Sequence, residues 1–197
     1  MNRYFPLLLI FILIGGCAQA PAKLEQLQPS RWLEHQLAVS AIQSWNIRGR
    51  ISVKTPHDSG TATLSWKQQF TDYEMRVIAP FGQGTYTLKG YANGVVMHGP
   101  NNETLTADSP EELMAQGFGW SVHLEGLKYW VRGIPEPGVK YSDLTLDENG
   151  RMSRLRQSGF DVSIQRYTMD ATGALPEKIF IEGDNIELKM IIQSWET

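Results

Sequence analysis

The chain has 197 residues, with 18 basic and 21 acidic side chains and a formal net charge of −3. This length is typical of one domain, and a mildly acidic chain without a basic cluster argues against a nucleic-acid partner. The single cysteine excludes a disulfide within a monomer, so stability must come from strand pairing and apolar burial, to which six tryptophans contribute.

The first seventeen residues are typical of an export signal. Arg3 gives a basic start, the run Leu7–Ile14 is unbroken apolar, and Gly15-Gly16-Cys17 follows at once. Spanning a bilayer takes about 20 apolar residues, so this shorter run fits a secretory signal with small residues at the cleavage site. The cysteine after the small pair resembles the bacterial lipobox.

The lipobox resemblance implies that residues 1–16 are removed and that Cys17 is lipidated on its sulfur and acylated on its new amine. The alternative is an ordinary signal peptide with an incidental cysteine, although a free thiol in an oxidising compartment is a liability. In the sorting rule for such proteins an aspartate after the cysteine favours the inner membrane, so Ala18 implies the outer membrane. Residues 17–29 are polar and without period, which predicts a lipidated tether before a single domain at residues 30–197.

The pattern after the tether predicts one helix and then a long series of strands. Helical spacing of apolar residues, with Ser30 as N-cap, predicts a helix at Arg31–Gln43. A period of two follows, which is typical of half-buried strands. It predicts strands at about 45–53, 61–66, 73–77, 84–91, 95–98 and 104–107, with Asn93-Gly94 as a hairpin turn.

Two short helices and five more strands complete the prediction. Ser109 caps a helix at Pro110–Gln116 that stops before Gly117, and a second helix covers Leu124–Val131. Strands then follow at 141–146, 152–157, 160–167, 178–182 and 186–195. The last is almost continuously apolar, which favours a strand covered on both faces.

These elements predict a mainly β fold with some helix. Meandering strands form an antiparallel sheet, and a sheet of about ten or eleven strands curls. The helices must bury their apolar faces, and the concave side of the sheet is the natural place. We therefore expect an incomplete barrel that encloses about three helices over an apolar cavity. The inward-facing candidates for the cavity lining are Trp45, Ile47, Leu64, Trp66, Met75, Leu88, Met114, Leu127 and Trp130.

The side chains that could bind a metal or take part in catalysis are scattered along the sequence. His35, His57, His98 and His123 stand at no metal-ligand spacing, and Gly82-Gln83-Gly84 lacks the strand-to-helix context of a phosphate loop. We predict no catalytic residue, metal or cofactor, and no enzyme activity.

Several motifs are distributed over nearly the whole mature chain. They are Trp45-x-x-x-Gly49-Arg50-Ile51, Leu64-Ser65-Trp66-Lys67-Gln68, Ala79-Pro80-Phe81-Gly82, Gly119-Trp120, Leu127-Lys128-Tyr129-Trp130-Val131-Arg132-Gly133, Gln157-Ser158-Gly159-Phe160, Leu175-Pro176 and Trp195. In this order they resemble the LolB family of outer-membrane lipoprotein receptors. Phe81 stands where leucine is usual and Phe160 where tryptophan is common. In both cases one large apolar side chain replaces another.

The resemblance implies a half-barrel shared with the periplasmic carrier LolA. A monomer would accept acylated lipoproteins from a LolA-like carrier through its apolar cavity and insert them at the lipid surface of the outer membrane, facing the periplasm. Without periplasmic ATP, transfer must run towards tighter binding, and each tenfold step needs about 1.4 kcal/mol. A cavity without directional bonds also explains a broad range of clients.

The loop Pro80-Phe81-Gly82 is predicted to deliver the cargo to the membrane. Proline and glycine favour a tight turn that pushes Phe81 outward, and the alternative is that Phe81 folds back into the core. The resemblance favours the exposed role. The residues leave two alternative functions. One is a structural lipoprotein that binds a partner through a sheet edge. The other is an envelope hydrolase, for which the sequence shows no nucleophile or metal cluster.

Overall fold

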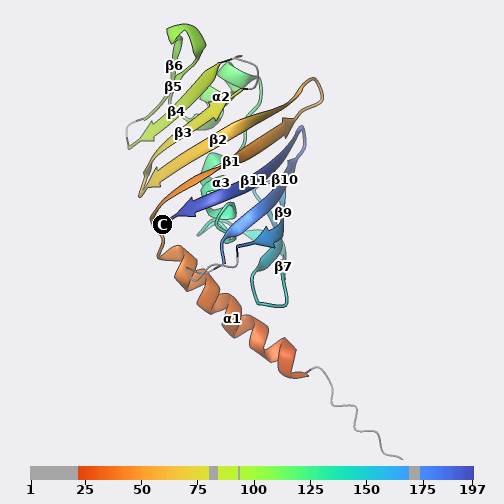
Figure 1. Ribbon diagram of the computed structural model, residues 1–197. Coiled ribbons are helices and arrows are strands. Elements are labelled where there is room, and N and C mark those ends of the chain that lie inside the picture. The colour runs from red at the N-terminus through yellow and green to blue at the C-terminus, as the bar shows by residue number, and fades with distance from the viewer. Residues whose placement is uncertain (1–21, 80–83, 93, 169–173) are drawn as a thin grey trace, which may run out of the picture.

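The computed structural model describes residues 22–79, 84–92, 94–168 and 174–197, and its strands form a single curled sheet (Figure 1). The strand order is β6-β5-β4-β3-β2-β1-β11-β10-β9-β8-β7, and every neighbouring pair is antiparallel. Strands β6 and β7 form the two edges, so the barrel is incomplete. The predicted fold class is therefore confirmed.

The predicted strands are all present, with ends that differ by a few residues. They are β1 (Ser44–Lys54), β2 (Ser59–Gln69), β3 (Asp72–Ile78), β4 (Thr85–Tyr91), β5 (Gly94–His98), β6 (Thr104–Ala107), β7 (Tyr141–Leu146), β8 (Met152–Gln157), β9 (Phe160–Tyr167), β10 (Pro176–Gly183) and β11 (Ile186–Glu196). A short 3₁₀ turn, η2 (Pro100–Asn102), joins β5 to β6.

Strand β1 shows how the alternation builds the two faces of the sheet. Trp45, Ile47 and Ile51 are buried on the concave face, whereas Arg48 and Arg50 are exposed. The β1–β11 ladder contains a bulge at Gly49, where a Cβ would lie 2.1 Å from the Ile191 carbonyl oxygen. Only glycine permits this close approach between the two backbones.

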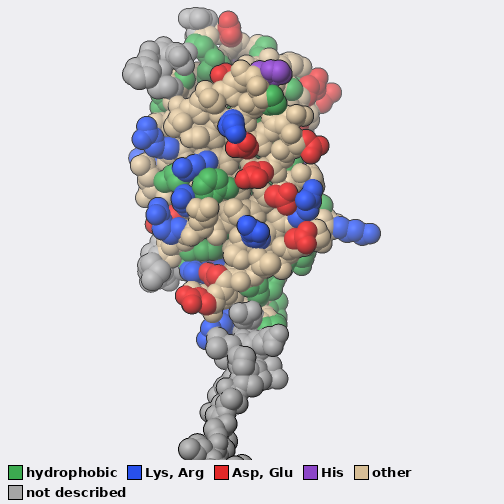
Figure 2. Space-filling view, turned by 90° about the vertical axis from the view of Figure 1, so that its right-hand side faces the viewer, with side chains coloured by type: hydrophobic (Ala, Val, Ile, Leu, Met, Phe, Trp, Pro, Cys, Tyr) green, Lys and Arg blue, Asp and Glu red, His purple; other side chains and the backbone are tan. Residues whose placement is uncertain are grey.

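The prediction that the last strand is covered on both faces is wrong. Leu188 and Met190 of β11 are buried, but Glu187 and Lys189 between them are exposed. The helices at residues 110–118 and 124–130 lie on the concave side of the sheet (Figure 1), so the convex face meets water. Figure 2 shows acidic and basic side chains interspersed over the surface turned to the viewer, with small apolar areas between them.

Helices α2 (Pro110–Phe118) and α3 (Leu124–Trp130) fill the concave side and are called the lid helices below. The Ser109 hydroxyl accepts the predicted capping bond from the Glu112 amide, at 3.2 Å. Helix α2 runs past its predicted end because Gly117 is needed for packing: a Cβ there would lie 2.0 Å from Met97 Cε. The left-handed residue that ends α2 is Gly119, with φ 73°.

Helix α1 (Ala22–Ser40) begins nine residues before the predicted start at Arg31 and ends three residues before Gln43. Residues 22–29, expected in the tether, therefore lie in this helix, and Pro29 is inside it. The segment 22–28 consists of good helix formers without an apolar period, and a prediction based on periodicity missed it. Trp32 and Val39 of α1 pack against the barrel, whereas no helix of the described residues is long and apolar enough to cross a membrane.

Candidate functional site

An enclosed apolar cavity lies between the concave face of the sheet and the lid helices, and we call it the central cavity. Its volume is about 40 Å³. The strands contribute one wall and the lid helices with their connection contribute the other. The lining residues are Ile51, Met75, Val77, Tyr86, Leu88, Met114, Trp120, Val122, Leu124, Leu127 and Leu188.

Such a lining favours hydrocarbon without selecting a particular molecule. Apart from the Tyr86 hydroxyl, its side chains offer carbon, thioether sulfur and an indole ring. Small-molecule sites usually measure about 300–1,000 Å³, far more than the central cavity. The cavity of this structure is therefore closed, and a long chain can enter only when its walls separate.

The predicted lining residues fall into two groups. Met75, Leu88, Met114 and Leu127 line the central cavity. The others lie in the packed core, each at most 2 % exposed, and do not line this cavity: Trp45, Ile47, Leu64, Trp66 and Trp130. Period-two alternation places all inward strand residues on one face, and it does not say which of them the lid helices will cover.

The buried tryptophans are held by ring packing and hydrogen bonds. The Trp45 ring centroid lies 4.9 Å from that of Trp66 and 5.5 Å from that of Trp195. The indole nitrogen of Trp66 donates to Gln68 Oε1 at 3.2 Å, and that of Trp130 to Gln157 Oε1 at 2.8 Å. These contacts fix the rings as structural core.

The sequence reasoning missed several lining residues. Ile51 and Leu188 occupy inward strand positions, so the same alternation would have included them. Val122 and Trp120 lie in the connection between α2 and α3, where no period exists. The only signal for Trp120 was its place in the Gly119-Trp120 motif.

Polar contacts hold the lid helices together at one point. Glu111 Oε1, in the first turn of α2, accepts from the Leu124 amide at the start of α3, at 2.9 Å. It also lies 3.6 Å from His123 Nδ1, while His123 Nε2 lies 2.8 Å from Glu136 Oε2. His123 thus bridges the start of α2 and the segment that follows α3.

Side-chain hydrogen bonds join α3 and the segment after it to the sheet. The buried Gln157 of β8 accepts from Trp130 Nε1 and the Glu136 amide and donates to the carbonyls of Glu136 and Val139. Helix α2 instead packs on the edge strands β5 and β6.

A second depression opens at the end of the barrel where the β1–β2, β8–β9 and β10–β11 turns meet. We call this end the loop end and the depression the loop-end cleft. Its volume is about 730 Å³, and it is lined by residues 55–58, 119–121, 158–160 and 183–186. Trp120 lines both the cleft and the central cavity. Trp120 is therefore a point at which the cavity and the cleft adjoin.

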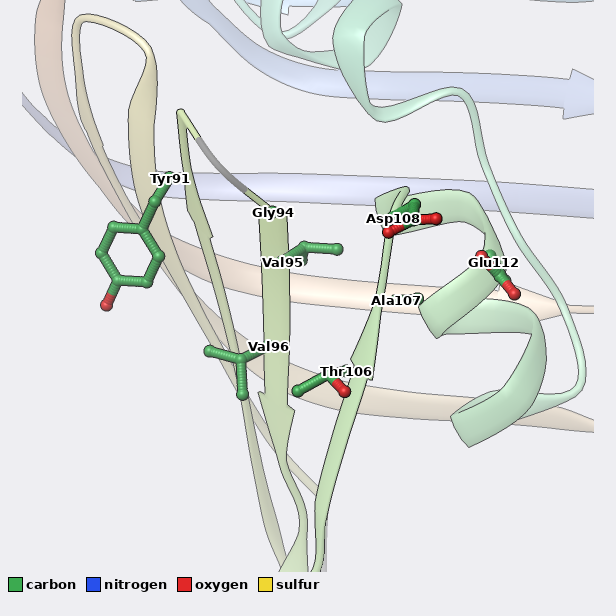
Figure 3. A pocket seen from close by; sticks show the side chains of 8 residues that line it. All are labelled: Tyr91, Gly94, Val95, Val96, Thr106, Ala107, Asp108 and Glu112. Carbon is green, nitrogen blue, oxygen red and sulfur yellow. The ribbon is translucent and has the colours of Figure 1, made fainter.

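A third depression follows the free edge of the sheet, near the start of α2 (Figure 3). Its volume is about 590 Å³. Val95 points towards the side of Asp108 and Glu112, whereas Val96 and Thr106 lie on the other side of the edge strands. Because its residues come from both sides of the edge, no convergent set of polar groups forms there.

Several predicted site residues fall outside the described part of the chain. Cys17 and the loop Pro80-Phe81-Gly82 belong to this group, so their roles remain predictions. Among the described residues, no group of three or more His, Cys, Asp or Glu side chains could hold a metal ion.

The comparisons with known proteins agree with this architecture. The family model described as "Outer membrane lipoprotein LolB" matches residues 43–195. The chain belongs to the LolB family. The LolB protein of Nitrosococcus oceani is 34 % identical over 191 residues, covering 96 % of this chain and 95 % of the relative. The LolB protein of Ectopseudomonas mendocina is 33 % identical over 199 residues, covering 100 % and 97 %.

Solved structures show the same fold at low sequence identity. A LolA superfamily protein from Nitrosomonas europaea has a TM-score of 0.53 at 7 % identity, covering 86 % of this chain and 92 % of that chain. A DUF1329 family protein from Desulfovibrio piger has a TM-score of 0.53, covering 87 % and 92 %. The family prediction is confirmed: the protein is an outer-membrane lipoprotein that acts in the localisation of lipoproteins to that membrane.

Proposed function

We propose that this LolB-family protein takes the acyl chains of a lipoprotein from a LolA-like periplasmic carrier into its central cavity and releases them into the outer membrane. The observation that carries the proposal is the composition of the cavity, which is lined almost wholly by apolar side chains beneath the lid helices. Lipidation at Cys17 would hold the protein at the membrane, and the monomer would be the working form.

The closed cavity implies that loading moves the lid. Helix α3 is tied to β8 through Trp130 and Gln157, so α2 and the Gly119–Val122 connection are the parts that would shift. Trp120 would move with them and join the central cavity to the loop-end cleft. An acyl chain that prefers the open state shifts the population towards it by its differential affinity.

This mechanism needs no energy source beyond apolar burial. Each Å² of apolar surface removed from water contributes about 25 cal/mol, and a tenfold difference in affinity between carrier and receptor corresponds to about 1.4 kcal/mol. Closure of the empty cavity also protects its apolar walls from water. Delivery would then require an acceptor that buries the chains still better, and a bilayer does so.

A pair of neighbouring positions on α2 tests the proposal. Met114 is buried in the cavity wall, whereas Ala115 is exposed on the same helix. Met114→Asp places a charge against the acyl chain, and we expect binding of a fluorescent fatty acid and acceptance of lipoprotein from the carrier to fall at least about tenfold. Ala115→Asp adds the same charge outside and should change neither.

Thermal unfolding of both variants separates a damaged site from a damaged fold. If a folded Met114→Asp protein binds fatty acid and accepts lipoprotein as the unmodified protein does, the central cavity is not the acyl site. A role as a structural lipoprotein with a partner on a sheet edge would then be favoured.

A further inference from the structure

The two ends of the barrel differ in surface chemistry. At the loop end lies the cleft described above. At the opposite end, which we call the α1 end, helix α1 packs against the barrel and the β2–β3 turn lies beside it, since the Phe70 amide donates to the Gln43 carbonyl at 3.0 Å. The 11 residues of β1 lead from one end to the other, a distance of roughly 35 Å.

Helix α1 exposes two large apolar side chains at the α1 end. Leu33 is 55 % and Leu37 is 64 % exposed. Their spacing of four residues places them on one helix face, together with Pro29, Ser30 and Ser40 and without a charged residue. Val39, on the opposite face, is buried against the barrel. One side of α1 is thus packed against the barrel, and its outer side carries an uncharged strip with two exposed leucines.

The neighbouring turn presents a third exposed apolar side chain, Phe70. It is 68 % exposed and has φ 54°, a left-handed conformation that a bulky side chain rarely adopts. Buried Gln68 holds the turn, because its amide nitrogen donates to the carbonyls of Phe70 at 2.8 Å and Asp72 at 3.2 Å. In a two-residue hairpin turn, Asn or Gly would fit this conformation better. The structure therefore maintains an outward aromatic ring against the local preference of the backbone.

The clefts at the two ends are lined by charges of opposite sign. Phe70 and Ser40 line a cleft of about 420 Å³ at the α1 end that also contains Lys128 and Arg132. Among the described residues, no aspartate or glutamate lines it. The loop-end cleft instead contains Asp58 and Asp184, and no lysine or arginine lines it. An anionic phosphate would therefore be attracted to the cleft beside Phe70 and repelled from the loop-end cleft.

The chain before α1 leads directly to the proposed lipid. Cys17 lies five residues before Ala22, the first residue of α1, so the two are separated by at most about 18 Å. Figure 1 shows α1 running away from the sheet at the end opposite to the loop end. A lipid on Cys17 therefore reaches the bilayer from the α1 end.

We propose that the α1 end is a membrane-contacting foot: Leu33, Leu37 and Phe70 rest in the headgroup layer of the bilayer, and the basic cleft beside Phe70 faces lipid phosphates. The inference rests on the proposed lipidation of Cys17. In this orientation of the domain on the membrane, the loop-end cleft points into the periplasm, where a soluble carrier can reach it. A contact of three side chains breaks readily, so the domain can tip about its short tether when the cargo is delivered.

The absence of other cysteines in the chain provides a direct test. The lipidated full-length protein is placed in vesicles of phosphatidylethanolamine and phosphatidylglycerol, with a polarity-sensitive dye on Leu37→Cys or, as the control, on Asp184→Cys at the loop end. We expect the fluorescence emission of the dye at position 37 to shift to the blue and this dye to be shielded from an aqueous quencher. The dye at position 184 should remain accessible to the quencher. Equal shielding, no shielding, or the reverse order would overturn the proposal.

A second measurement uses variants that preserve the fold. Phe70→Asn suits the left-handed turn and should leave the melting temperature unchanged, while shielding at position 37 falls by roughly half or more. Tyr141→Asn removes an aromatic ring of similar exposure, 49 %, on the edge strand β7 and should leave shielding unchanged. If Phe70→Asn has no effect, the foot does not include this turn and the proposal fails as stated.

Two controls separate this proposal from others. The mass of the acylated N-terminal fragment establishes lipidation, so loss of the anchor is recognised independently of the foot. Shielding at position 37 that requires added carrier, or that rises with the protein density of the vesicles, would assign the face to a carrier or to a second copy and would overturn the membrane proposal. Acceptance of lipoprotein in solution should be the same with Phe70→Asn as without it.

Discussion

Trp66 and Met75 face each other across β2 and β3, yet they occupy different environments. Trp66 is fully buried in the core, whereas Met75 lines the central cavity. A packed side chain contributes mainly to stability, and a side chain at an empty space contributes mainly to binding. This pair therefore allows the two contributions to be measured at one place in the sheet.

We expect Trp66→Ala to lower the free energy of unfolding by about 3–5 kcal/mol while the folded fraction binds fatty acid with nearly unchanged affinity. Met75→Ala should cost less stability, about 2 kcal/mol, because part of its surface already faces a cavity, and should weaken fatty-acid binding. Denaturant unfolding and fluorescence titration give the two quantities. A Trp66→Ala protein of normal stability and lost binding would instead assign Trp66 to the acyl site.

His35 is a half-buried titratable group at the α1 end. Burial, assisted by the nearby Arg151 cation and opposed by Asp147, lowers the pKa of His35. Its Nε2 is buried without a hydrogen-bond partner, and its ring packs near Trp32 and Tyr167. The neutral form is therefore the one that fits between α1 and the barrel.

The sign of the pH effect follows from this direction. Above a pH of about 6.5, the ordinary pKa of histidine, the ring is neutral in both states and stability does not depend on it. As the pH falls below that value, the unfolded chain binds the proton more readily, so the free energy of unfolding decreases. We expect His35→Phe to reduce the loss of melting temperature between pH 7.5 and 5.5. Equal pH curves for the protein and for His35→Phe would contradict this.

At the scale of elements, the connections at the loop end determine what can reach the cavity. The loop predicted for membrane delivery joins β3 to β4 at this end, because Ile78 and Thr85 pair there. Exposed Ile78 lies at the end of β3, next to this segment. If the foot faces the membrane at rest, the delivery loop would engage the bilayer only when the domain tips.

We expect Phe81→Glu to fold and to accept lipoprotein from the carrier, but to fail in transfer to liposomes. Burial of one aromatic side chain contributes about 1.5–3 kcal/mol, and a carboxylate at the same position opposes insertion. Circular dichroism, an acceptance assay and a liposome-transfer assay measure the three steps separately. Loss of folding would indicate that Phe81 is a core plug, and normal delivery would indicate that the loop has no membrane role.

At the scale of the whole molecule, anchor and cavity are separable. The proposed lipid site precedes α1, and the central cavity is lined by the sheet, the lid helices and their connection. A soluble Cys17→Ala protein should therefore accept lipoprotein from the carrier at a rate within about twofold of the detergent-solubilised lipidated form, without nucleotide. A requirement for the lipid or for a nucleotide in a purified transfer assay would show that the cavity alone does not account for acceptance.

The sequence pattern was sufficient to predict the strands and an antiparallel curled sheet, but not the pairing of β1 with β11 that sets the strand order. Period-two alternation and turn residues define strands such as β1 and β8 because side-chain burial on one face is a local property of the chain. Short turns make consecutive strands antiparallel neighbours within β1–β6 and within β7–β11. Motifs such as Leu127–Gly133 were sufficient to indicate the family, which the comparison over residues 43–195 confirms.

The tertiary structure alone decided which inward residues face empty space. Trp45 and Met75 have the same sequence signature, but lid helices cover the concave face unevenly, so one packs tightly and the other lines the central cavity. The same holds for the last strand, whose apolar run concealed exposed positions, and for α1, whose first residues show no apolar period in the sequence. Packing joins residues that are distant in the chain, as the Trp130–Gln157 bond does, and a periodic pattern contains no information about such partners.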